Sequence, residues 1–150
     1  MKIKIVCVGE LKEKYFKDAI AEYTKRLSRY CSLEIKEVAQ SKIDDATLSK
    51  KQEENAILEA LEGYVITCEI DGEQMSSEHF AKKLNEVSLK ASTITFVVGG
   101  SHGLSPKVSE RASYKWSFSK LTFAHQLFRV NLLEQVYRGY CILNHVPYHK

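Results

Sequence analysis

The sequence has few cysteines and no long apolar run, and both absences exclude whole classes of protein. Its four cysteines are scattered without a CxxC pair, which argues against a disulfide scaffold or a zinc site, so we expect reduced and mostly buried thiols. The N-terminal stretch rich in apolar residues, Ile3 to Val8, is only six residues long. It is too short for a signal-peptide core or a membrane span, and we expect a cytoplasmic protein with no membrane segment.

The usual sets of catalytic side chains are also missing. The sequence shows no Ser-His-Asp order, no paired carboxylates and no metal-ligand spacing near its glycine-rich segment, so we expect neither a hydrolase triad nor a metal centre. No GKS or GKT accompanies the glycines, and they lie too late in the chain for the dinucleotide fingerprint of a first βα unit. This lack of catalytic side chains is consistent with a cofactor that supplies its own reactive group.

What remains is the balance of one ordinary globular domain. The chain has 150 residues, 44% of them hydrophobic and 27% charged, and we expect residues 1–150 to form a single domain. The net charge of +3 is weak evidence for a nucleic-acid partner. Basic residues do gather in one early segment, most simply as the solvated face of a helix: Lys12, Lys14, Lys17, Lys25, Arg26 and Arg29.

Strand and helix patterns alternate along the first two thirds of the chain. Four short stretches are rich in β-branched residues, which is typical of strands: Ile3–Val8, Leu33–Val38, Tyr64–Ile70 and Thr93–Val98. Apolar residues at helical spacing lie between them, in the segments Phe16–Leu27, Leu48–Leu61 and Phe80–Val87, the last behind the possible caps Ser76 and Ser77. This alternation predicts an α/β fold with a largely parallel sheet, helices on both faces, and the last two stretches as central strands.

The pattern changes after Val98. A glycine loop is followed by a short helix with Ser105 as N-cap and Pro106 at its first position, and Tyr114–Ser119 indicates a fifth strand. The segment Leu127–Leu143 is a helix with apolar residues on nearly all sides, more than a monomer of this size could bury. We therefore expect a homodimer in which a partner subunit covers this helix.

Three loops are expected at one edge of the sheet. Gly99 and Gly103 follow a strand directly, where open α/β folds bind ligands, and glycine lets backbone approach a ligand closely. Tight turns needed only for chain reversal are an equal alternative for these glycines. The loop Phe118–Phe123 leaves the same edge, as does the stretch Cys68–Gly72, which we expect to end in a turn at Asp71-Gly72.

Polar residues with possible chemistry lie at both ends of the last helix. His125 and Arg129 are four positions apart and hence on one face, although His125 can equally serve as a cap and Arg129 can pair with Glu134 or with solvent. The tail NHVPYHK combines two imidazoles, a phenol and a lysine. Tails are usually disordered, but an aromatic ring among donors can stack on an RNA base while cations contact phosphates.

Three of these segments, together with the opening of the chain, carry a resemblance. FVVGGSHGLSP, KWSFSKLTFAHQLFRVNLLEQVYRGYCIL, the closing PYHK and the opening KIKIVCVGELKEKYFKDAIAEYTKRL are similar to the RlmH family of SPOUT methyltransferases. The resemblance spans essentially the whole chain. It implies S-adenosylmethionine as cofactor, N3 of a pseudouridine in large-subunit ribosomal RNA as substrate, a homodimer, and a parallel-sheet SPOUT fold with a C-terminal trefoil knot, a topology that periodicity cannot reveal.

The resemblance also assigns residues. The family's cofactor contacts fall on the three loops, at Cys68, Gly99, Gly103, Phe118, Ser119, Lys120, Leu121, Thr122 and Phe123. The family often has leucine at the position of Cys68, proline at that of Ala124 and arginine at that of Lys150. The first change preserves a backbone contact, the second loosens the loop, and the third keeps a cation but loses bidentate phosphate geometry, which bears on RNA affinity.

Within this scheme His125 is the candidate base for the pseudouridine N3 proton and Arg129 a candidate electrostatic stabiliser, because methyl transfer needs an aligned and deprotonated nitrogen. Tyr148, His149 and Lys150 are candidate contacts to the RNA, which we expect to be bound within the ribosome. The alternative from another functional class is a non-catalytic RNA- or nucleotide-binding module on the same fold.

Overall fold

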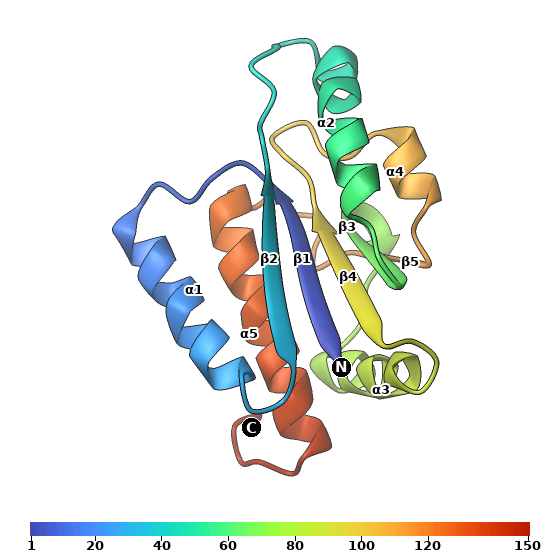
Figure 1. Ribbon diagram of the computed structural model, residues 1–150. Helices are drawn as coiled ribbons and strands as arrows, with labels where there is room; N and C mark the ends of the chain where they lie inside the picture. The colour runs from blue at the N-terminus through green and yellow to red at the C-terminus, as the bar shows by residue number, and fades with distance from the viewer.

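Five parallel strands form one sheet in the order β2-β1-β4-β3-β5 (Figure 1). The computed structural model describes all residues from Met1 to Lys150. The strands are β1 (Lys2–Val8), β2 (Ser32–Val38), β3 (Tyr64–Glu73), β4 (Thr93–Val98) and β5 (Tyr114–Trp116). The prediction of a parallel α/β sheet is confirmed. So is the central position of β4, whose six residues are all buried, with β3 directly beside it.

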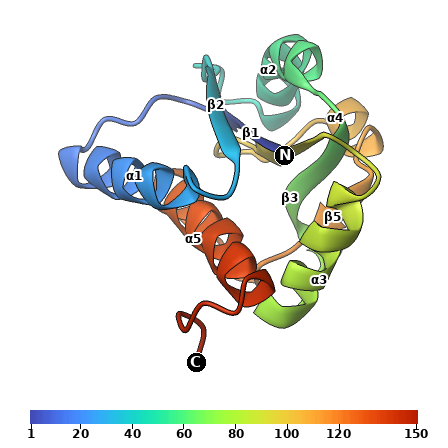
Figure 2. The same ribbon diagram turned by 60° about the horizontal axis from the view of Figure 1, so that its bottom comes forward.

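Helices cover both faces of this sheet. They are α1 (Lys14–Leu27), α2 (Ala46–Ala60), α3 (Ser77–Ser88), α4 (Pro106–Glu110) and α5 (His125–Leu143). Figure 2 shows α1, α3 and α5 on one face and α2 with α4 on the other, each side packing its own group of buried apolar residues against the strands. No helix has the length and apolar character needed to cross a bilayer.

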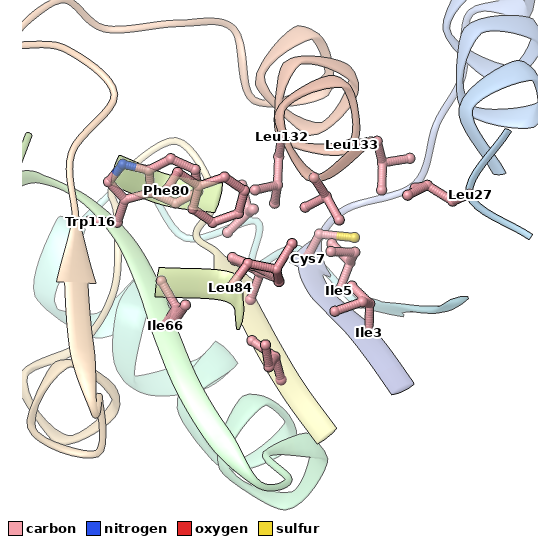
Figure 3. Close-up of a cluster of buried hydrophobic side chains, with 14 of the residues drawn as sticks. Ile3, Ile5, Cys7, Leu27, Ile66, Phe80, Leu84, Trp116, Leu132 and Leu133 are labelled. Carbon is pink, nitrogen blue, oxygen red and sulfur yellow. The ribbon is translucent and has the colours of Figure 1, made fainter. Parts of the chain in front are cut away.

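The larger core lies between the sheet and the helices α1, α3 and α5 (Figure 3). Phe80 of α3 stacks on Trp116 of β5 with ring centroids 4.3 Å apart, and Leu132 and Leu133 of α5 are fully buried. Each such side chain contributes roughly 1.5–3 kcal/mol by leaving water. This burial holds α5 across the sheet and thereby sets where its two ends lie.

Of the predicted caps, Ser76 and Ser105 are confirmed, whereas Ser77 is the first residue of α3. The Ser76 hydroxyl accepts a hydrogen bond from the backbone N–H of His79 (3.1 Å), so α3 begins where its sequence indicates. Ser105 accepts from the N–H of Val108 (3.3 Å), with Pro106 in the first turn of α4. These bonds satisfy donors that the first turn of a helix leaves free.

Two predicted boundaries are wrong. The expected turn at Asp71-Gly72 is part of β3, which continues to Glu73 with a shift of register against β5. Glycine is needed at position 72 because the β3 and β5 backbones approach closely there: a Cβ on Gly72 would lie 2.7 Å from the carbonyl of Lys115. In addition, β5 ends at Trp116, before the expected Ser119, because Ser117 already donates its N–H to the Glu73 carbonyl at the end of β3.

All four cysteines are free thiols, as the sequence predicts. Cys7 and Cys141 are buried, and Cys31 and Cys68 are half-buried. Burial raises the pKa of the Cys7 and Cys31 thiols to about 11. Both therefore stay protonated, and weakly nucleophilic, at neutral pH.

Candidate active site

A cavity of about 430 Å³ opens at the edge of the sheet where β3, β4 and β5 end. Its walls come from the three loops that the sequence singles out, and every predicted cofactor residue lines it except Lys120. The volume lies within the range of small-molecule sites. Because carboxyl ends of parallel strands meet at one edge, segments as far apart along the chain as Cys68 and Phe118 contribute to one cavity.

The glycine loop lines the cavity from Gly99 to Leu104. Gly103 donates its N–H to the carbonyl of Gly100 (3.0 Å) and has a φ of +80°, a conformation that side chains rarely adopt. A Cβ on Gly99 would lie 2.8 Å from the carbonyl carbon and oxygen of Gly103. No residue with a side chain fits at Gly99 unless the loop moves.

The loop after β5 also lines the cavity. The Ser119 hydroxyl accepts the N–H of Leu121 (3.0 Å), and the Ser117 hydroxyl donates to the Ser119 carbonyl (3.1 Å). Phe118 packs between Trp116 and Phe128, with ring centroids 4.4 Å and 4.5 Å away. The cavity thus has rigid aromatic sides and backbone groups, which suit a flat heterocycle.

Glu69, within β3, places a carboxylate in the cavity wall. The carboxylate is held by the hydroxyl of Thr67, which donates to Oε2 over 2.6 Å, and by that of Ser109, which donates over 2.9 Å. Asp71 lines the same cavity but is exposed. Nowhere in the structure do three or more His, Cys, Asp or Glu side chains gather in a way that could hold a metal ion.

His125, the first residue of α5, also lines the cavity. Burial lowers the pKa of its imidazole, and the positive charge of Arg129 one turn away lowers it further, against a smaller opposite effect from Glu53. The ring is therefore neutral at pH 7. A neutral imidazole facing a cavity is able to accept a proton.

Arg129 does not reach the cavity. Its side chain is 1% exposed and donates from Nη1 to Glu37 Oε2 (2.8 Å) and from Nη2 to the Gly9 carbonyl (3.0 Å). The arginine thus ties α5 to the ends of β1 and β2 beneath His125. The expected alternatives of Glu134 or solvent as its partner are wrong, since Glu134 instead binds Arg138 (2.6 Å).

The tail lies at the far end of α5 (Figure 1). Tyr148 donates its hydroxyl to Glu134 (3.0 Å), and His149 lies 3.1 Å from Arg138 and 2.9 Å from Glu78, whereas Lys150 is exposed. A helix of 19 residues is about 28 Å long. The tail of a subunit is therefore ordered against its own α3 and α5, but remote from that subunit's cavity.

Comparison with known proteins places this geometry in a family. The family model described as "Predicted SPOUT methyltransferase" matches residues 1–149. The chain belongs to the SPOUT methyltransferase family. It is 49% identical to "Ribosomal RNA large subunit methyltransferase H" of Clostridium tetani and 52% identical to "Putative ribosomal RNA large subunit methyltransferase H" of Methanococcus maripaludis, with 100% of both chains covered in each case.

A solved structure shares the fold of this SPOUT methyltransferase. It is a probable methylase family protein from Haemophilus influenzae, with a TM-score of 0.60 and 16% identity over 99% of this chain and 70% of that one. At this identity the likeness concerns the fold.

The sequence of this SPOUT methyltransferase predicts which loops form the cavity better than it predicts which side chains line it. Trp116, Phe128, His102 and Glu69 all line the cavity, yet none was singled out. The pattern of β3 could have revealed Glu69. It places a carboxylate directly after the apolar residues of a buried strand, where that carboxylate needs a neighbouring element or a ligand as partner. The aromatic residues carry no such signal, since core packing explains them equally well.

Proposed function

We propose that this protein transfers a methyl group from S-adenosylmethionine to N3 of a pseudouridine in large-subunit ribosomal RNA, in the cytoplasm and as part of ribosome maturation. The observation that carries the proposal is one cavity lined together by residues of β3, by the glycine loop and by the loop after β5, in a chain matched over residues 1–149 by a methyltransferase family. Relatives of about half identity, named as ribosomal RNA large subunit methyltransferases, support the substrate class. The proposal includes a single domain and the family's trefoil knot.

The cavity fits the proposed cofactor. Backbone of the glycine loop and of Phe118–Phe123 would hold the adenine, and Cys68 would offer its backbone beside them, because all three segments line the cavity. The cofactor supplies an electrophilic methyl group when bound. The chain's main task is then to hold cofactor and base in line and to exclude water, which supplies much of the acceleration.

His125 would accept the N3 proton of the pseudouridine. It lines the cavity and is neutral at pH 7, because burial and Arg129 lower its pKa. Arg129 would act through His125, by fixing the first turn of α5 through Glu37 and the Gly9 carbonyl and by keeping the imidazole uncharged. A base matched to neutral pH is what removal of an imide proton requires.

The tail would complete the site of a second subunit. Tyr148 and His149 are held at the end of α5 opposite to His125, so they can meet substrate only beside another copy's cavity. The homodimer expected from the apolar α5 would provide this arrangement, and Leu121 and Leu127, 70% and 43% exposed near the start of α5, are apolar surface for a partner to cover.

We expect light scattering at micromolar concentration to report a stable dimer, because an active site shared between subunits requires an obligate interface. Replacing Leu127 with aspartate should shift the protein toward monomer and lower methyl transfer in parallel. Leu89→Asp is the matched control, since Leu89 is 81% exposed at the end of α3. A monodisperse monomer with full activity would refute the shared site.

Replacing Gly99 with valine should weaken binding of S-adenosylmethionine by about a hundredfold or more, while the protein stays folded. The added Cβ would lie 2.8 Å from the Gly103 backbone and push the loop into the space for the cofactor. Calorimetry gives the affinity and thermal unfolding the stability. Glu110→Val is the control, since Glu110 is exposed and does not line the cavity. Normal binding by a folded Gly99 variant would show that this loop does not hold the cofactor.

The function itself is tested with methyl-labelled S-adenosylmethionine and ribosomes from cells that lack the endogenous enzyme. Label should enter one pseudouridine of the large-subunit RNA, and mass spectrometry of the nucleosides should place it on N3. Free large-subunit RNA in a parallel reaction identifies the substrate form. Cofactor binding without label in either RNA would instead support the non-catalytic RNA-binding alternative.

A further inference from the structure

Glu69 has a carboxylate that is held in the cavity wall by hydrogen bonds from two hydroxyl groups. Two hydroxyls fix its carboxylate: Thr67 donates to Oε2 (2.6 Å), and Ser109 lies 2.9 Å from Oε1 and 3.1 Å from Oε2. These two protons leave part of the acceptor capacity of a carboxylate unused, because its two oxygens together offer about four acceptor positions. The side chain is thus fixed in orientation and still able to accept.

No cation of the protein compensates this charge. The ion pairs of the structure do not include Glu69, although its side chain is partly buried and its carboxylate is bound only by the hydroxyls of Thr67 and Ser109. Holding a carboxylate in such surroundings costs free energy unless donors or a positive charge face it. Glu69 lines the cavity, so a donor or cation of a ligand bound there would compensate this charge.

We propose that Glu69 is a cofactor-recognition residue that accepts hydrogen bonds from donor groups of S-adenosylmethionine, either the ribose hydroxyls or the α-ammonium group. The inference rests on the proposed function and deepens it. Both candidate groups can donate hydrogen bonds to a carboxylate. A carboxylate fixed at this position therefore favours them over ligand groups that can only accept. Cys68, the neighbouring residue, would contribute backbone, and Glu69 would contribute charge and orientation.

The competing role is a structural clasp, since the Ser109 bonds connect β3 to α4. Three variants separate the two roles in calorimetric titrations with S-adenosylhomocysteine, the stable product. Glu69→Gln removes the charge and half of the acceptor oxygens. Ser109→Ala removes the clasp but keeps the carboxylate, and Asp71→Asn removes a charge from an exposed side chain of the same cavity.

We expect the dissociation constant to rise about tenfold or more for Glu69→Gln and by less than about threefold for Ser109→Ala and Asp71→Asn. Thermal unfolding without ligand reports the stability of each variant. An unchanged affinity of Glu69→Gln would overturn the proposal. Equal losses for Glu69→Gln and Ser109→Ala would overturn it as well, because the clasp would then explain both.

Truncated ligands on the unmutated protein identify the donor and do not depend on any variant folding. 5′-Methylthioadenosine keeps the ribose and lacks the ammonium group, and it is compared with its 2′,3′-dideoxy form; S-adenosylhomocysteine is compared with its deaminated analogue. If the affinity falls about tenfold within one pair, the group that differs in that pair is the donor to Glu69. That difference in affinity should vanish in Glu69→Gln. If neither truncation costs more than about threefold, the proposal is refuted. Failure of unmutated protein to bind S-adenosylhomocysteine would refute the proposed cofactor, a distinct outcome.

Discussion

Deleting Tyr148, His149 and Lys150 should lower the rate of methyl transfer by at least about a hundredfold while the affinity for S-adenosylmethionine stays within about twofold. The tail lies at the end of α5 opposite to the cavity, so its loss leaves the cofactor loops intact. It removes the phenol, imidazole and amine that would position the base, and each tenfold loss of rate corresponds to about 1.4 kcal/mol of barrier. Single-turnover kinetics with saturating RNA, together with calorimetry, measure both quantities.

Mixed dimers decide which subunit supplies the tail. A dimer of one tail-deleted subunit and one His125→Ala subunit would contain one intact site if the tail serves the partner's cavity, and none if it serves its own. We expect about half of the native rate from purified mixed dimers, because one site of two is restored. An inactive mixed dimer would contradict the shared site, and a tail-deleted homodimer with native rate would remove the tail from the reaction altogether.

The anchor of the tail can be tested separately. The hydrogen bond with His149 lowers the pKa of the Glu78 carboxyl to about 2, so Glu78 remains charged over the whole range in which the protein is assayed. Glu78→Gln leaves Tyr148 and its bond to Glu134 in place. As a control for the deletion it should reduce the rate far less than removal of the tail itself.

Replacing His125 with alanine should lower the single-turnover rate by about 10²–10⁴-fold, the usual contribution of a general base. In the native protein the pKa of His125 is lowered below its ordinary value of 6.5. The proton-accepting form therefore predominates at neutral pH, and the native rate should fall only as the pH drops below that lowered pKa. In the variant the rate should instead rise with pH, because the pseudouridine imide then ionises without help.

His102→Ala is the matched control for this experiment, since His102 is the other imidazole of the cavity and is exposed on the glycine loop. It should keep the native dependence of rate on pH. A slow His125 variant that does not recover at high pH would assign His125 a positioning role only. A native rate in the His125 variant would exclude it from the chemistry.

Much of the fold follows from local sequence patterns. β4 runs from Thr93 to Val98 as predicted, and α3 and α4 begin behind the predicted caps Ser76 and Ser105. These features depend on neighbouring residues alone: a run of β-branched side chains, or a hydroxyl beside free backbone donors. The loops of the site were predictable for a related reason, because parallel strands must end at one edge of the sheet.

Side-chain partners and distances between distant segments were decided by the tertiary structure. Arg129 binds Glu37, 92 positions away, and the sequence suggested Glu134 because it is near along the helix. The Asp71-Gly72 pair has turn composition but lies in β3, since β5 backbone approaches it too closely for a side chain. The sequence by itself determined the alternating elements, their caps and the loops of the cavity, because each depends on short-range periodicity or backbone freedom. Only the tertiary structure decided that Arg129 is buried beneath His125, that Glu69 faces the cavity and that the tail is remote from it, because these depend on how α5 crosses the sheet.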